Sequence, residues 1–107
     1  MDSNFRWFVT KKAKEDLERN INFLIENSDY PENSRRLAHS IESGIIFLSQ
    51  FPYTGQVYEE DEVAHENIYR YSLRNGFVIF YQVLQKERTI IILRVLSSRQ
   101  DQKPFTS

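Results

Sequence analysis

The spacing of the apolar residues changes once along this chain, and that change limits the folds that the sequence can adopt. From Ala13 to Ile25 the apolar residues recur at the spacing of one face of an α-helix. After residue 67 they come instead in short β-branched and aromatic runs, which are typical of strands. Helical segments followed by a series of strands predict an α+β domain.

A strand and two helices are expected before that change. The bulky run from Phe5 to Val9 predicts the strand, and Thr10 supplies a side-chain oxygen suited to cap the helix that follows. Pro31 can occupy the first turn of a second helix, because its missing N–H has no partner there in any case. That helix is expected to end at or before Phe51, since the residue preceding a proline is kept out of the α region. The two helices form a hairpin.

Three strands are expected in the second half, over residues 68–73, 77–84 and 89–96. Between the first two, Asn75-Gly76 is the preferred two-residue type I′ turn, in which both residues have positive φ. Residues 52–67 are expected to hold little regular structure. The run from Phe77 to Tyr81 is apolar on both faces, so the sheet is covered by the helices on one side and partly shielded on the other. The expected order is β-α-α-β-β-β, with the helical hairpin packed on a small, mainly antiparallel sheet.

The 107 residues suit a single domain spanning 1–107, because no linker or composition shift divides them. With 40% hydrophobic residues, the chain is expected to bury a core rather than remain disordered. The sequence has no cysteine, which excludes a disulfide or a thiolate nucleophile and fits a reducing compartment. No membrane span or secretory signal is expected.

Charge is unevenly distributed, although the net charge is only −1. Residues 67–107 hold seven basic and two acidic side chains, whereas residues 31–66 hold two and seven. The basic segment suits an acidic protein partner or a nucleic acid, or it is simply part of a mixed, solvated surface. Direct DNA binding by this chain alone is not expected, because the chain is nearly neutral and lacks an Arg- or Lys-rich recognition helix.

Signatures of metal, nucleotide and nucleophilic enzymes are missing. Three glycines form no phosphate-binding loop, and His39 and His65 are expected to be ordinary surface or boundary residues. The acidic run from Glu59 to Glu62 is interpreted as a solvated loop rather than a cation site. No cofactor and no metal are therefore expected.

Two arginines on the expected strands are harder to assign. Arg70 lies between two tyrosines, and Arg94 interrupts an apolar strand. A guanidinium beside aromatic rings can bind phosphate and stack a base. Arg70 can equally pair with a carboxylate such as Glu42 or Glu66, and the sequence leaves both interpretations open. The polar residues just past the last strand mark either a site or merely a terminus: Ser97, Ser98, Arg99 and Asp101.

Five short motifs, in the right order, give the chain a family resemblance. They are the aromatic first strand, Ala13-x-x-x-Leu17, Leu48-x-x-x-Pro52-x-x-Gly55, the run Asn75 to Gln82, and Ile92-Leu93-Arg94-Val95-Leu96-x-x-Arg99-x-Asp101. Together they resemble the RelE/ParE superfamily of bacterial type II toxin–antitoxin toxins. The resemblance implies a cytoplasmic toxin that forms a hetero-oligomer with a neutralising antitoxin protein. An amphipathic antitoxin helix and strand addition at a sheet edge are the binding modes that such a surface offers.

The RelE-like branch cleaves messenger RNA with an ensemble of basic side chains, and this chain matches only part of that ensemble. Arg70 and Arg99 match basic positions of those ribonucleases. Val78 stands where they usually carry arginine, and Ser72 replaces a second basic residue. Phe105, at best the C-terminal aromatic residue, has no proton to give. An endoribonuclease that uses Arg70 and Arg99 is therefore the alternative function.

The ParE-like branch consists of non-enzymatic inhibitors of DNA gyrase, many of which carry an apolar residue at the position of Val78. Their usual ending Leu-His-x-x-x-Asp corresponds to the segment Leu96 to Asp101 here, with Ser97 in place of the histidine. The resemblance therefore favours a toxin that binds gyrase and stabilises its cleaved-DNA complex, and that is not an enzyme. A third hypothesis is an inactive relative kept as a DNA-binding co-repressor with its antitoxin. The expected target contacts are Arg99, Asp101 and Arg94.

Overall fold

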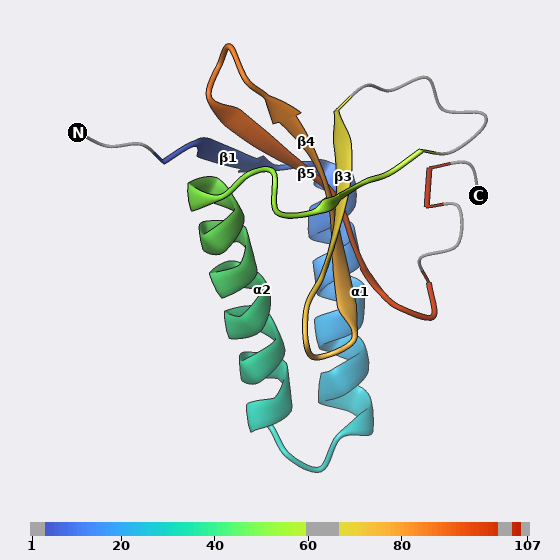
Figure 1. Ribbon diagram of the computed structural model, residues 1–107. Coiled ribbons are helices and arrows are strands. Elements are labelled where there is room, and N and C mark those ends of the chain that lie inside the picture. The colour runs from blue at the N-terminus through green and yellow to red at the C-terminus, as the bar shows by residue number, and fades with distance from the viewer. Residues whose placement is uncertain (1–3, 60–66, 101–103, 106–107) are drawn as a thin grey trace.

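The chain folds into two helices that lie on one face of a five-stranded sheet (Figure 1). The computed structural model describes residues 4–59, 67–100 and 104–105. The strand order is β1-β5-β4-β3-β2, in which β1 and β5 are parallel and the other neighbours antiparallel. The expected α+β class and the helical hairpin on a mainly antiparallel sheet are confirmed. The elements are β1 (Arg6–Val9), α1 (Lys11–Asn27), α2 (Glu32–Gln50), β2 (Gln56–Val57), β3 (Ile68–Ser72), β4 (Phe77–Leu84) and β5 (Thr89–Ser97).

Local signals in the sequence set the ends of both helices. The hydroxyl of Thr10 accepts a hydrogen bond from the backbone N–H of Ala13 at 3.1 Å, which caps α1 as predicted. Pro31 occupies the N-cap of α2, one position before the first turn in which it was expected. Helix α2 ends at Gln50, because Phe51 precedes a proline and adopts φ −131° and ψ 70°, outside the helical region.

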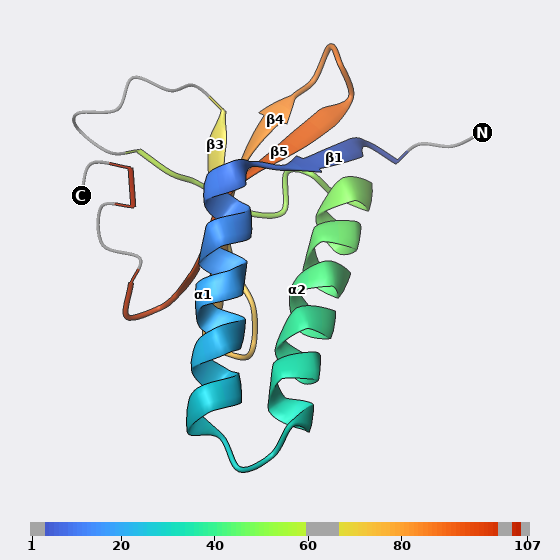
Figure 2. The ribbon, with the colours of Figure 1, turned by 180° about the vertical axis from the view of Figure 1, so that it is seen from behind.

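The larger core lies between the sheet and the two helices, which run side by side across that face (Figure 2). Alternate residues of β4 and β5 point into it, while α1 and α2 each contribute one apolar stripe. Burial of these stripes places α1 against β5, so side chains of α1 reach the end of that strand. The most deeply buried members are Ala13, Leu48, Ile79, Tyr81, Ile90, Ile92 and Val95.

The opposite face of the sheet has a smaller core of its own. Val78 and Phe80 of β4 and Leu96 of β5 are buried there, with Tyr58 and Phe105 packed against them. The rings of Phe80 and Phe105 meet edge to face, with their centroids 5.7 Å apart. The expectation that β4 and β5 are shielded on both sides is confirmed. Part of that second cover comes from Phe105.

The segment after α2 contains a strand that the sequence did not predict. Gln56 and Val57 form β2 and pair with Arg70 and Tyr69 of β3. A strand of two residues is too short to leave a periodic pattern, and the pairing depends on residues more than ten positions away. Among the described residues of 52–67 this is the one strand, so the expectation of little regular structure holds there, while β2 itself was missed.

The turn between β3 and β4 also differs from the prediction. The N–H of Leu73 donates to the carbonyl of Phe77 at 2.8 Å, so the loop between them has one residue more than the expected two-residue turn. Of Asn75 and Gly76, only Gly76 has a positive φ, +84°, so the turn is not type I′. The side chain of Asn75 is engaged instead, since it accepts from the N–H of Phe77 and donates to the hydroxyl of Ser40 on α2.

Candidate functional site

Arg94, an expected target contact, is held by a buried carboxylate. Its side chain is 13% exposed, and that of Asp16 on α1 is fully buried. The guanidinium donates from Nε to Oδ2 of Asp16 at 2.7 Å and from Nη2 to Oδ1 at 2.9 Å, a bidentate pair. The same Oδ2 accepts from the backbone N–H of Val95 at 3.1 Å. Asp16 therefore pins α1 to β5 beyond the point where β1 ends.

A further donor of Arg94 holds Pro104. Its Nη1 donates to the backbone carbonyl of Pro104, and Pro104 is itself buried. The next residue, Phe105, packs into the smaller core. These contacts give Arg94 a structural role, because it links α1, β5 and the Pro104–Phe105 pair on the far face of the sheet.

Arg70 lies on the face of the sheet that the helices do not cover. Its neighbours in β3 are tyrosines that pack against the larger core, so strand alternation turns Arg70 the other way. Its Nη1 donates to the hydroxyl of Ser72 at 2.8 Å. Of the two carboxylates considered as partners, Glu42 lines a hollow between the helices and β1, and Glu66 lies outside the described residues.

Arg99 is exposed and lies beside the C-terminal half of α1. Together with Phe23 and Leu24 of α1 and Phe77 of β4, it lines a hollow of about 420 Å³. No carboxylate within the described part of the chain pairs with its guanidinium. Asp101, the remaining expected target contact, lies outside the described residues.

A hydrogen-bonded turn after β5 sets the position of Arg99. The side-chain oxygen of Gln100 accepts from both the N–H and the hydroxyl of Ser97, each at 3.1 Å. The N–H of Ser98 donates to the carbonyl of Gly76 at 2.8 Å, which ties the turn to the β3–β4 loop. Ser97, at the position of the family's usual histidine, thus takes part in the turn that presents Arg99.

Arg70 and Arg99, the pair of the ribonuclease alternative, do not face a common space. Arg70 is directed to the side of the smaller core, whereas Arg99 lines a hollow with α1 on the helix side. The buried side chains of Val78 and Phe80 lie on the Arg70 side, in the smaller core. Cleavage of a phosphodiester needs its acid, its base and its charge-stabilising groups within reach of one phosphate. The hollows lined by Arg70 and by Arg99 share no residue.

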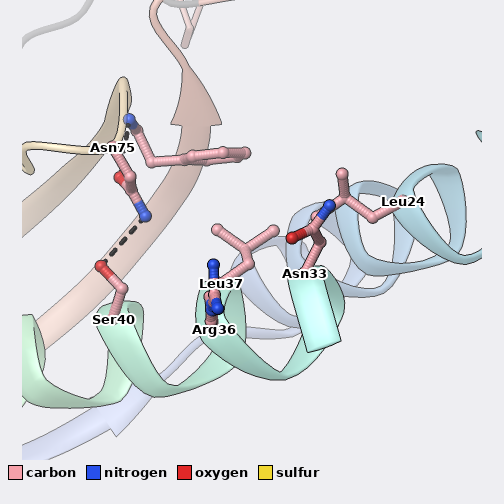
Figure 3. A pocket seen from close by; sticks show the side chains of 7 residues that line it. Leu24, Asn33, Arg36, Leu37, Ser40 and Asn75 are labelled. Atoms are coloured by element: carbon pink, nitrogen blue, oxygen red, sulfur yellow. Dashed lines mark hydrogen bonds between the residues drawn. The ribbon is translucent and has the colours of Figure 1, made fainter. Parts of the chain in front are cut away.

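A second hollow adjoins that of Arg99. It has a volume of about 360 Å³ and lies between α2, the end of α1 and the β3–β4 loop. Figure 3 shows Arg36 of α2 among the lining residues and, one turn farther along the same helix, the hydrogen bond of 3.0 Å from Asn75 to Ser40. Leu24 and Phe77 line both hollows, so the two meet there. Sequence reasoning missed Arg36, because the hollow is assembled from three separate segments and no motif marks it.

Tyr81 carries a phenol whose surroundings perturb it. Its side chain is fully buried, and its hydroxyl donates to the carbonyl of Pro52 at 2.8 Å and accepts from the N–H of Gly55 at 3.0 Å. Burial raises the pKa of Tyr81 to about 12, despite the opposing effect of the bond from Gly55. Through these two hydrogen bonds the Tyr81 hydroxyl holds the loop after α2, at Pro52 and Gly55, against β4. The close approach of Tyr81 explains why the Leu48-x-x-x-Pro52-x-x-Gly55 motif ends in glycine, because a Cβ at Gly55 would lie 2.6 Å from the Tyr81 oxygen.

The histidines and the acidic run, the remaining candidates from the sequence, form no metal or catalytic site within the described residues. His39 is exposed on α2, while His65 and most of the acidic run lie outside the described residues. The described residues contain no group of three or more His, Asp or Glu side chains placed to hold a metal ion. Neither described helix is long and apolar enough to cross a membrane.

Comparisons with known proteins agree with this fold. The sequence matches the family described as the ParE toxin of the type II toxin–antitoxin system parDE over residues 8–102. No curated protein matches it.

Three solved structures share the architecture at low sequence identity. A chain of the chromosomal ParDE system from P. aeruginosa superposes with a TM-score of 0.68 at 18% identity, covering 90% of this chain and 98% of that one. A chain of the toxin–antitoxin complex RelBE2 from Mycobacterium tuberculosis gives 0.62 at 21% identity, with 88% and 98% covered. A chain of the E. coli RelBE toxin–antitoxin complex gives 0.57 at 11% identity, with 87% and 95% covered. At such identities the likeness shows the fold.

Proposed function

This chain belongs to the ParE toxin family of type II toxin–antitoxin systems, and we propose that it acts by binding DNA gyrase and stabilising the complex of gyrase with cleaved DNA. Its toxicity then comes from a protein–protein interface rather than from a reaction on RNA. The observation that carries this proposal is the separation of Arg70 and Arg99, which face opposite sides of the sheet.

The surroundings of Arg70 support a function without catalysis. The face toward which Arg70 is directed holds the buried Val78 and Phe80, and Phe105 packs over them. Arg94, a second cation in the same part of the sheet, has its guanidinium occupied by Asp16. Stabilising a pentavalent phosphate needs preorganised positive charge directed at one point. We therefore assign target contact to Arg99 and Asp101, and a structural role to Arg94.

We also propose that an antitoxin binds at the exposed edge of the sheet formed by β1. The solved relatives come from toxin–antitoxin systems or complexes. In this chain β1 is an edge strand, and its Trp7 and Phe8 are 44% and 60% exposed. An edge strand with exposed aromatic residues suits strand addition by a partner. Binding of the antitoxin there keeps the toxin inactive in the cytoplasm.

Two single substitutions test the proposed function in cells. Arg99→Ala is expected to weaken growth arrest on induced expression, because it removes a target contact. Arg70→Ala is expected to leave arrest intact, because Arg70 faces away from Arg99. Far-UV circular dichroism of both purified variants checks that they fold. Loss of arrest in folded Arg70→Ala, together with restored messenger RNA integrity, would instead indicate the ribonuclease alternative.

A further inference from the structure

We propose that the two adjoining hollows form one docking groove for an acidic, amphipathic segment of the toxin's target protein. We call it the two-arginine groove, because Arg36 lies at one end and Arg99 at the other. The inference rests on the proposed function, since the occupant belongs to the target that the toxin binds. Leu24 and Phe77 line both hollows and so form the wall between the two arginines.

The charge of the groove fits an acidic occupant. Neither hollow is lined by a carboxylate among the described residues, and each contains one arginine. Arg36 is 77% exposed, and within the described residues its ion pair is a 3.7 Å surface contact with Glu32, one turn earlier on α2. Exposed pairs of this kind contribute little, so an incoming carboxylate can replace Glu32 at small cost. Arg99 has no carboxylate partner in the described chain. An occupant that carries two carboxylates can therefore pair one with Arg36 and the other with Arg99.

The apolar wall between the arginines indicates a protein rather than a nucleic acid. Leu24 and Phe77 form the shared wall, Leu37 is buried at one end, and Phe23 is 62% exposed at the other. Apolar side chains on one face of an amphipathic helix can bury this surface. A nucleic acid gains most of its affinity from cations that follow its backbone, and the described lining offers two.

Hydrogen bonds on both rims hold the groove in shape. On one rim Asn75 donates to Ser40 at 3.0 Å, which ties the β3–β4 loop to α2. On the other rim Gln100 accepts two hydrogen bonds from Ser97. A preorganised surface loses less conformational entropy on binding than one that must order first. These hydrogen bonds therefore preorganise the groove for binding.

The test uses charge reversal at both ends and an apolar change between them. Arg36→Glu/Arg99→Glu removes the charge match, and Phe23→Ser removes an exposed apolar contact. Arg35→Glu is the charge control for Arg36→Glu alone, which is assayed beside the double variant, because Arg35 is exposed on the same helix and lines neither hollow. Ile25→Ser is the apolar control, because Ile25 is 61% exposed on α1 and also lines neither. Each variant is assayed for growth arrest, for binding to purified gyrase with DNA, and for capture by the antitoxin that neutralises the wild type.

The expected result separates the two kinds of partner. The double charge reversal should abolish growth arrest and weaken gyrase binding by at least about tenfold, with antitoxin capture unchanged. Phe23→Ser should weaken gyrase binding in the same direction, and both controls should behave as wild type. Arrest that persists in the double variant overturns the inference. Loss of antitoxin capture with gyrase binding intact also overturns it, because the groove would then be an antitoxin surface.

Failure of the proposed function gives a different result. A wild-type toxin that arrests growth without binding gyrase refutes the gyrase proposal. The double variant then still tests the groove: lost arrest with intact antitoxin capture supports a target contact there, and retained arrest overturns it.

Discussion

Removing the carboxylate of Asp16 should destabilise the domain strongly. In the wild type this fully buried side chain accepts from Nε and Nη2 of Arg94 and from the backbone N–H of Val95. Asp16→Ala leaves the guanidinium, 13% exposed, without its counter-charge, and leaves the Val95 N–H without an acceptor. Breaking a buried pair from one side costs about 3–5 kcal/mol. Since a domain of this size has a free energy of unfolding of about 5–15 kcal/mol, the variant should be weakened but still measurable.

The assay is urea denaturation followed by far-UV circular dichroism, with the free energy of unfolding obtained by linear extrapolation. The informative control is Asp16→Leu/Arg94→Met, which replaces both charges with apolar side chains. Because the double variant buries no unpaired charge, it should be more stable than Asp16→Ala by at least about 1 kcal/mol. A loss below about 1 kcal/mol for Asp16→Ala would refute the structural role assigned to Arg94, as would a double variant no more stable than Asp16→Ala.

Four further measurements test other parts of the structure. Burial raises the pKa of Tyr81 from 10.0 to about 12. The unfolded chain therefore loses this proton at lower pH than the folded chain, and stability should fall by about 2 kcal/mol between pH 10 and 12. Urea titrations at both pH values check this, and Tyr81→Phe should lack that contribution. Gly55→Ala should cost about 1–3 kcal/mol, because its Cβ would lie 2.6 Å from the Tyr81 oxygen and 2.9 Å from the Arg70 carbonyl; an unchanged urea midpoint would contradict this close approach. Gly76→Ala should cost about 1–2 kcal/mol through its φ of +84° alone, since no atom lies within 4 Å of the added Cβ; a larger loss in thermal unfolding would mean that the turn is packed. Thr10→Ala should cost about 1 kcal/mol by removing the cap of α1, and amide hydrogen exchange should show the loss first at the start of that helix.

The elements that could be predicted from the sequence are those with local causes. Thr10 caps α1 through a residue three positions away, and Phe51 ends α2 because of the proline that follows it. The strands of the second half were predictable because each apolar run ends at a turn signal or a charged cluster. The family resemblance, and not a local signal, predicted how the strands and helices pack together. It also predicted that the chain is a toxin of a toxin–antitoxin system, which the family match over residues 8–102 confirms.

Features that depend on distant residues were not predictable in the same way. The pair between Asp16 and Arg94 joins positions 78 residues apart. The sequence held one sign of this buried pair: Asp16 follows Ala13 by three positions, which places its side chain on the buried side of α1. The groove at Arg36 left no such signal, because it exists only once the β3–β4 loop packs on α2. The turn type was mispredicted for a similar reason: the side chain of Asn75 is held by Ser40, which propensity alone does not include.

The most direct test of the central claim is a single assay in which purified toxin meets both targets. Toxin is added to gyrase with supercoiled DNA and, in parallel, to ribosomes carrying a messenger RNA, with and without antitoxin. If the toxin poisons gyrase, linear, gyrase-bound DNA accumulates and supercoiling falls, the message remains intact, and antitoxin reverses the effect. Cleaved message with normal supercoiling would contradict it, and would mean that Arg70 and Arg99 act together in catalysis despite facing opposite sides of the sheet.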